Sequence, residues 1–414
     1  MIQFERFRLR NGLSILMHQD PHTPMAAVNI LYKVGARDED PEKTGFAHLF
    51  EHLMFGGSVN IPSYDNPLQQ AGGENNAFTN NDFTNYYLTL PKNNLETAFW
   101  LESDRMLSLA FSRKSLRVQK QVVTEEFKQN YLNQPYGDVY LLLKPLAYKH
   151  HPYQWNTIGK EISHIEKATM DDVKHFYSRY YNPNNAILCV TGNIHPDKVI
   201  PQIENWFGSI PSGAELQRNY PAEPEQKENR TLTVERDVPQ DALYMAWHMP
   251  ARNEKEYYTS DLISDLLSNG DSSRLFQRLV KDKQWFTDIN AYITGDMDRG
   301  LFIISGKLNP SVDFHSAEEQ IEKELTKLTE HLVEEEELQK VKNKIEANLV
   351  FSEISILGKA MSLSYFEMLS KAEDINNETE KYQAVRREDI REQARKLFAE
   401  GKKNVLYYKA KKNS

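Results

Sequence analysis

Apolar residues follow two different periods along this chain, and each period predicts one kind of element. Short continuous apolar runs, such as residues 186–190, are typical of strands that are buried on both faces. Longer segments, such as 44–55 and 112–132, repeat their apolar residues every three to four positions and predict helices. Predicted strands and helices alternate along the chain, in two halves.

A polar stretch separates the two halves. Residues 211–229 include Pro221 and Pro224 and have the composition of a linker. A chain of 414 residues is long enough for two or more domains. We therefore expect a first domain over residues 1–212, a linker over 213–230 and a second domain over 231–414.

The two halves also share a weak internal repeat. Asp171 and Asp172 precede the apolar run 186–188, and Glu388 and Asp389 precede a similar run at 404–406, offset by 217 residues. Near the front of each half, residues 36–38 resemble residues 251–253, offset by 215. Two matches at nearly one offset predict a duplication.

The helix predicted at 44–55 has the composition of a metal site. His48, Glu51 and His52 form the pattern H-x-x-E-H. At about 100° per residue, His52 lies about 40° and Glu51 about 60° from His48, so all three project from one side. Two imidazoles can ligate zinc and the carboxylate can act as a general base. The alternative is a pair of histidines packed in the core.

The helix predicted at 112–132 offers a third ligand. Ser112 is its expected N-cap and Pro135 its expected stop. Glu126 falls inside its apolar stripe, where an unpaired carboxylate is costly and a metal would be its partner. The stripe comprises Leu116, Val122, Val123, Phe127 and Tyr131.

Two neighbours of Glu126 have other interpretations. Glu125 falls on the outer face and is expected to be solvated. Gln119 lies two turns before Glu126 on the same stripe, where it is either a hydrogen-bond partner of the metal ligands or an ordinary buried amide.

Bulk properties narrow the function classes. A net charge of −9 argues against nucleic acid as a partner and mildly favours a cationic substrate. The single cysteine, Cys189, excludes an internal disulfide framework, and its apolar surroundings favour a buried strand thiol over a nucleophile. The sequence contains neither an apolar run of membrane-spanning length nor a signal-peptide core near Met1, so we expect a cytoplasmic protein with no membrane partner.

With its two candidate metal helices, the chain resembles the pitrilysin/insulinase metallopeptidases, whose zinc pattern is the inverzincin H-x-x-E-H. It is most similar to the short members related to mitochondrial processing peptidase. The resemblance extends over nearly the whole chain, through the stretches 72–79, 84–86, 151–159, 181–193 and 272–276.

The resemblance implies a fold and a substrate site. The fold is α+β: two similar domains, each an antiparallel sheet with helices packed on one face, enclosing a cleft. Asn76, Ala77, Phe78 and Thr79 correspond to the substrate-binding strand. In the second half, residues 263–267 are the repeat's equivalent of the metal motif at 48–52. They contain no histidine, so the second domain is expected to lack a metal.

These observations predict a zinc-dependent endopeptidase that hydrolyses oligopeptides or unfolded segments bound as an added β-strand. Zn²⁺ is held by His48, His52 and Glu126, and Glu51 is the general base. Two alternatives are a non-catalytic structural or chaperoning subunit of a peptidase-like assembly, and a zinc hydrolase with non-peptide substrates.

One departure from the family pattern concerns a partner. Active members similar to this chain have an Arg, and a Tyr seven residues later, in the second domain, where this chain has Val280 and Thr287. In the two-subunit members, a catalytically silent homologue supplies that pair. The resemblance therefore implies the catalytic subunit of a heterodimer; the alternative is a homodimer in which Arg278 or Tyr292 substitutes.

Overall fold

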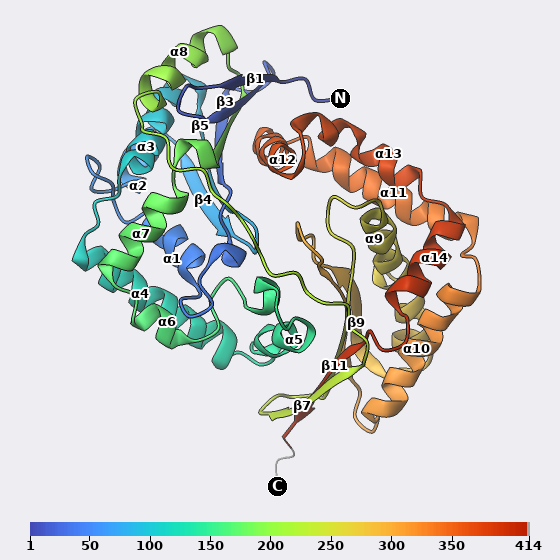
Figure 1. Cartoon of the computed structure of the whole chain (residues 1–414). Helices are drawn as coiled ribbons and strands as arrows, with labels where there is room; N and C mark the ends of the chain where they lie inside the picture. The colour runs from blue at the N-terminus through green and yellow to red at the C-terminus, as the bar shows by residue number, and fades with distance from the viewer. Residues whose placement is uncertain (412–414) are drawn as a thin grey trace. The chain divides into compact units, whose positions relative to one another are not determined.

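The computed structural model of the protein describes residues 1–411 and contains two compact units (Figure 1). The first unit comprises residues 1–129, 155–220 and 350–376, and the second comprises residues 130–154, 221–349 and 377–411. Each unit is built on one β-sheet and has its own hydrophobic core.

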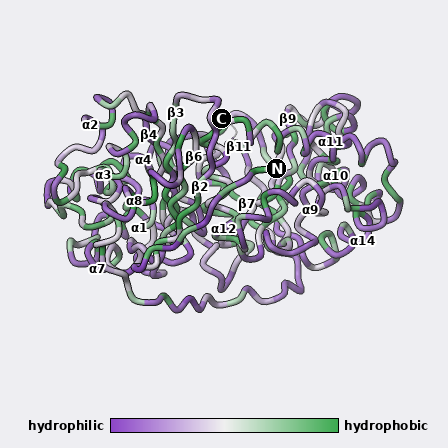
Figure 2. Tube along the Cα trace, turned by 90° about the horizontal axis from the view of Figure 1, so that it is seen from above, coloured by the Kyte–Doolittle hydropathy of each residue, from purple (hydrophilic) through white to green (hydrophobic). Residues whose placement is uncertain are grey.

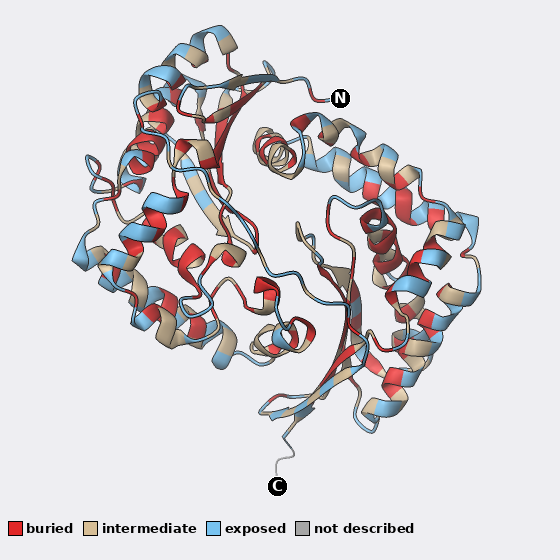
Figure 3. Ribbon diagram, viewed as in Figure 1, coloured by how far each residue is buried: buried red, intermediate tan, exposed pale blue. Residues whose placement is uncertain are grey.

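The sheet of the first unit has six strands, and the central ones are buried on both faces. Every residue of β6 is buried, including the Cys189 thiol predicted to lie in a strand (Figure 3). Figure 2 shows hydrophobic colour along β2 and β6. All neighbours pair antiparallel except β2 and β6, which are parallel. The spatial order is β1 (Glu5–Arg8), β2 (Ser14–Gln19), β6 (Ala186–Gly192), β3 (Met25–Tyr32), β5 (Thr84–Pro91) and β4 (Glu74–Thr79).

Helices cover both faces of this sheet. On one face α12 (Ile356–Leu369) packs against β3 and β6, and the Ser364 hydroxyl accepts a hydrogen bond from Asn29 at 3.0 Å. The other face carries the remaining helices of the unit: α1 (Phe46–Leu53), α2 (Asp65–Gln70), α3 (Leu95–Leu107), α4 (Arg113–Phe127), α6 (Ile162–Glu166), α7 (Met170–Tyr180) and α8 (Pro196–Phe207).

The second unit repeats this plan with five strands. Its spatial order is β7 (Arg230–Arg236), β11 (Asn404–Ala410), β8 (Ala242–His248), β10 (Leu301–Leu308) and β9 (Phe286–Ile293), with only β7 and β11 parallel. The helix α5 (Val139–Ala147) covers one face, and the other carries α9 (Lys255–Ser268), α10 (Phe314–Glu330), α11 (Glu335–Ser352), α13 (Glu378–Gln383) and α14 (Arg387–Leu397).

The predicted duplication is visible in the strand order. The strands β7, β11, β8, β10 and β9 occupy the places of β2, β6, β3, β5 and β4, with the same parallel pair. At the starts of α7 and α14, Asp172 and Asp389 each accept the backbone N–H three residues earlier, at 2.9 and 2.8 Å. The segment 263–267, which the repeat aligns with the metal motif, lies in α9, where Ile263 and Leu267 are fully buried.

The predicted α+β class with two similar domains is confirmed, and the structure refines it. Each sheet is mixed, because it contains one parallel pair. Each also has a helix on its second face, supplied by the other half of the sequence: α5 goes to the second unit and α12 to the first. The compact units therefore depart from the continuous ranges 1–212 and 231–414, because a strand buried on both faces needs apolar cover on each.

Residues 211–229 form neither helix nor strand, and Arg230, the last residue of the predicted linker, begins β7. The first part of this linker is held on the first unit, because Arg218 and Tyr220 bind the Asp38 carboxylate at 3.1 and 2.6 Å. No helix among residues 1–411 is by itself long and apolar enough to cross a membrane, although α11 and α12 taken together pass by length and composition.

Candidate metal centre

The short helix α1 begins at a left-handed glycine and is capped by a distant carboxylate. Gly45 has φ 88° and no side chain to cap the helix. Glu39 does so instead: its two oxygens accept the N–H groups of Gly45 and Ala47, each at 2.8 Å, and one also accepts Trp155 Nε1 at 3.1 Å. Burial raises the pKa of Glu39 to about 8, against the lowering effect of these bonds. The N-terminus of α1 is thereby fixed at Phe46, two residues before His48.

Apolar residues of α1 anchor the helix and leave its polar side free. Phe46, Ala47, Leu49, Phe50 and Leu53 are all buried. The side chains of His48, Glu51 and His52 are 14%, 18% and 24% exposed to solvent, so they are mostly buried but accessible to a small ligand. The two histidines are therefore not packed core residues.

The helix α4 brings the third side chain. Ser112 is its N-cap, as predicted, and accepts the Ser115 N–H at 3.4 Å. Val123 and Phe127 are buried and fix the helix, while Glu126 between them is 33% exposed. After Phe127 the chain continues in a π-helical turn, Lys128–Leu132.

The prediction that Val122 belongs to the buried stripe was wrong, because Val122 is 43% exposed. Val122 lies one turn before Glu126 on the same side of α4. This side is therefore open to solvent beside the two histidines, rather than packed in the core.

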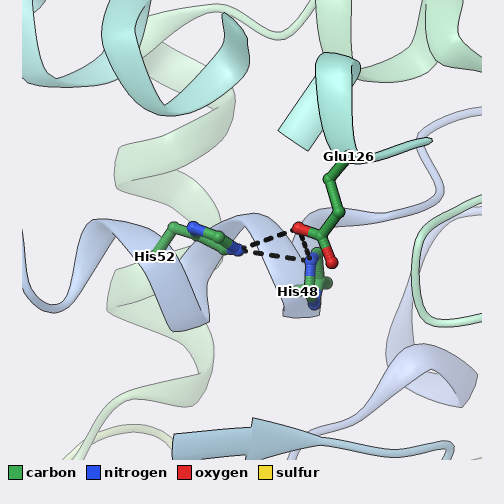
Figure 4. Close-up of side chains that lie close together, drawn as sticks. All are labelled: His48, His52 and Glu126. Carbon is green, nitrogen blue, oxygen red and sulfur yellow. Dashed lines mark hydrogen bonds and ion pairs between the residues drawn. The ribbon is translucent and has the colours of Figure 1, made fainter. Parts of the chain in front are cut away.

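His48, His52 and Glu126 point toward one another from two helices (Figure 4). His48 Nε2 lies 3.2 Å from Glu126 Oε2 and 3.3 Å from His52 Nε2, and the third side of this triangle is 3.5 Å. Zinc bonds of about 2.1 Å in a tetrahedron require ligand atoms about 3.4 Å apart. The three donors therefore fit a tetrahedral zinc ion that keeps its fourth position for another ligand.

The electrostatics also suit a cation. Burial lowers the pKa of His48, but hydrogen bonds with Glu126 and Glu51 outweigh it and raise this pKa to about 9. Hydrogen bonds from His48 and His52 lower the pKa of Glu126. The three groups thus attract positive charge strongly, and a metal that binds them would displace a proton from His48.

Glu51 is held beside the two histidines without joining their triangle. One of its oxygens, Oε2, accepts the Thr79 hydroxyl at 2.7 Å and lies 3.6 Å from His48 Nδ1. Burial raises the pKa of Glu51, but the hydrogen bonds of His48 and Thr79 outweigh this effect and lower it. Glu51 is therefore ionised and able to accept a proton.

The predicted substrate strand is β4, which pairs only with β5 and forms an edge of the first sheet. Ala77 directs its N–H away from β5, since the Asn76 side chain accepts it at 2.8 Å. Phe78 packs toward α12 with the buried Phe83. Thr79 faces α1 through its contact with Glu51.

The structure does not bring Gln119 into the site. Its side chain is partly exposed, and within residues 1–411 it has no hydrogen bond to the two histidines or to Glu126. The two positions at which similar active enzymes have the Arg/Tyr pair lie in the second unit. Val280 packs against that unit's core in the π-helical turn Phe276–Asp282, and Thr287 is exposed on β9.

Two residues serve this site in ways that the sequence pattern does not predict. Glu39 caps α1 from six residues before Gly45, and the signal was a helix start without a Ser, Thr, Asp or Asn cap. Thr79 is predicted on the substrate strand, and no sequence pattern signals the additional contact of its hydroxyl with Glu51.

Two family models match the chain: "Insulinase (Peptidase family M16)" over residues 14–160 and "Peptidase M16 inactive domain" over residues 167–345. Zinc protease PqqE of Helicobacter pylori is 32% identical over 352 residues, which is 84% of this chain and 79% of that protein. The uncharacterized zinc protease YmxG of Bacillus subtilis is 26% identical over 399 residues, 96% of each chain. The crystal structure of a protease from Helicobacter pylori is similar with a TM-score of 0.92 and 28% identity, covering 99% of this chain and 100% of that one.

Proposed function

This chain belongs to the insulinase family of peptidases, family M16, and we propose that it is a zinc-dependent endopeptidase acting on oligopeptides or unfolded segments. The observation that carries the proposal is the triangle of His48, His52 and Glu126 donor atoms, whose sides of 3.2, 3.3 and 3.5 Å match a zinc site. The names of the relatives, both called zinc proteases, support it.

The residues divide the chemistry between them. A zinc ion held by His48, His52 and Glu126 would polarise the scissile carbonyl and activate a water molecule. Glu51 accepts the proton of the attacking water and then donates it to the leaving amine. One oxygen of Glu51 lies 3.6 Å from His48 Nδ1, so this carboxylate stands beside a histidine that would hold the metal.

The substrate would bind as an added strand on β4. The outward N–H of Ala77 and the free edge of β4 offer backbone hydrogen bonds to any extended peptide. Such bonds depend little on which side chains the peptide carries, but they require its backbone to be extended. Oligopeptides and unfolded segments meet that requirement better than compact proteins do.

Removal of the metal tests the proposal. Chelation should abolish hydrolysis of a fluorogenic peptide, and added zinc should restore it. Replacing Glu126 with alanine removes one of three ligands, and should weaken zinc binding by more than about 100-fold, since even outer-shell partners of a metal cost 10–100-fold. Zinc content by mass spectrometry and peptide turnover measure the two effects.

The neighbouring Glu125 provides the matched control. It is 71% exposed and pairs with Lys128 at 2.8 Å, so Glu125→Ala should keep both zinc and turnover. Zinc affinity that Glu126→Ala leaves unchanged would refute the ligand assignment. Zinc binding without turnover of any peptide would favour the alternative function, a non-catalytic structural or chaperoning subunit.

A second variant tests the substrate strand. Ala77→Pro removes the outward N–H at the free edge, and a proline is tolerated there because this N–H is not part of the β4–β5 ladder. We expect KM to rise by about 10-fold or more, since one backbone hydrogen bond is lost and the ring obstructs the edge. Steady-state kinetics on an extended peptide measure it. Ala77→Ser, which keeps the N–H, should behave as the wild type; an unchanged KM in Ala77→Pro would place the substrate elsewhere.

A further inference from the structure

We propose that Thr79 is a positioning residue for Glu51: its hydroxyl fixes one oxygen of the carboxylate and leaves the other to accept the proton. The inference rests on the proposed function and deepens it. It links the edge that would bind the substrate to the general base, because Thr79 is the last residue of β4 and its hydroxyl contacts Glu51 in α1.

The hydrogen bonds of Glu51 distinguish its two oxygens. Oε2 accepts the Thr79 hydroxyl at 2.7 Å and lies 3.6 Å from His48 Nδ1. Within residues 1–411, no hydrogen bond or ion pair involves Oε1. Because Oε2 already accepts the Thr79 hydroxyl and Oε1 keeps both of its lone pairs for a water molecule, we assign Oε1 as the proton acceptor.

Thr79 itself is well fixed. Its hydroxyl also lies 3.5 Å from the Thr84 hydroxyl, which donates to the Val34 carbonyl at 2.9 Å. Thr84 is fully buried in β5 and pairs with Thr79 across the ladder. The position of the donor is therefore set by the sheet, and it can hold a carboxylate whose terminal torsion is otherwise broad.

The backbone of Thr79 belongs to the free edge of β4. Ala77 directs its N–H outward to Asn76, and Asn80 directs its N–H inward to Phe83 at 3.0 Å. Because the direction alternates along a strand, the N–H of Thr79 also points outward. A peptide that pairs with β4 as far as Thr79 would therefore lie directly beside the residue that orients Glu51.

This arrangement predicts a selective kinetic defect. Thr79→Val keeps the shape of the side chain but removes the donor, so Glu51 loses its fixed orientation while the zinc ligands are untouched. Since the lost bond is to a charged group, we expect kcat to fall by about 10- to 100-fold with little change in KM or zinc content. Thr79→Ser retains a hydroxyl and should restore most of kcat.

The matched control is Thr89→Val. Thr89 also donates to a carboxylate, that of Glu74 at 3.2 Å, and it lies at the opposite end of the same strand pair. It should keep the wild-type kcat. The zinc-loaded full chain is assayed with one extended fluorogenic peptide for all four proteins, and melting temperature and zinc content are measured in parallel.

The outcomes separate the possible roles of Thr79. A wild-type kcat in Thr79→Val overturns the inference, and so does a raised KM at unchanged kcat, which would make the hydroxyl a substrate contact. An equal loss in Thr79→Ser, or a loss of zinc or of folding that accounts for the fall, also overturns it. Absence of turnover in the wild-type chain overturns the proposed function, and this inference with it.

Discussion

Replacing Glu51 with glutamine should leave zinc bound and reduce kcat by about 10²–10⁴-fold, the range that general acid–base catalysis contributes. The amide has the same shape as the carboxylate and can still accept the Thr79 hydroxyl through its oxygen. It has no basic oxygen to take a proton from the attacking water or to return it to the leaving amine. Single-turnover hydrolysis of a fluorogenic peptide and zinc content by mass spectrometry are the two measurements.

The response to added zinc separates this base from the ligands. Glu126 belongs to the triangle of donor atoms, so the loss in Glu126→Ala should be partly recovered at high zinc concentration. Glu51 lies outside that triangle, and no concentration of zinc should rescue Glu51→Gln. Full activity in Glu51→Gln, or its rescue by zinc, would contradict the assignment of the base.

The features predictable from the sequence were those determined by local spacing. The H-x-x-E-H helix places its three side chains on one side through helical geometry alone, and the apolar anchors of α1 confirm that it is amphipathic. The duplication was also detectable, because the acidic caps Asp172 and Asp389 occupy one local position in each half.

Long-range pairing explains what the sequence left open. The apolar composition of α5 and α12 predicts that both helices pack against other elements but does not identify the sheet that each covers, and each helix covers the sheet of the other half. Val122 has the spacing of a buried residue, but spacing does not reveal that this side of α4 is open. Glu39 caps the start of α1 because the irregular segment between them turns back on itself, and the periodicity of apolar residues does not predict such a turn.

The isolated chain should be a weak peptidase that gains about 10²–10³-fold in kcat from a partner, because an active site that lacks a transition-state donor loses activity of that order. Neither candidate position can supply the donor. Val280 is aliphatic and packs against the core of the second unit, and the exposed Thr287 hydroxyl donates to the Lys307 carbonyl at 3.4 Å. We therefore propose a heterodimer with a homologue that lacks H-x-x-E-H and carries the Arg/Tyr pair. The measurement is kcat of the purified chain alone and with such a homologue from the same genome.

Two residues of this chain could replace the pair in a homodimer, and their contacts suggest how to test it. Arg278 is half exposed and only loosely paired with Asp282 at 3.6 Å, so it is free to reach a substrate. Tyr292 is bound to the Tyr140 hydroxyl at 2.8 Å and would have to leave it. In a homodimer, kcat should rise with the concentration of the chain alone, and Arg278→Ala should remove that rise. In a heterodimer, Arg278→Ala should have no effect, while the homologue restores activity even to dilute protein. Full activity of the dilute chain, unchanged by any homologue, would rule out the need for a partner.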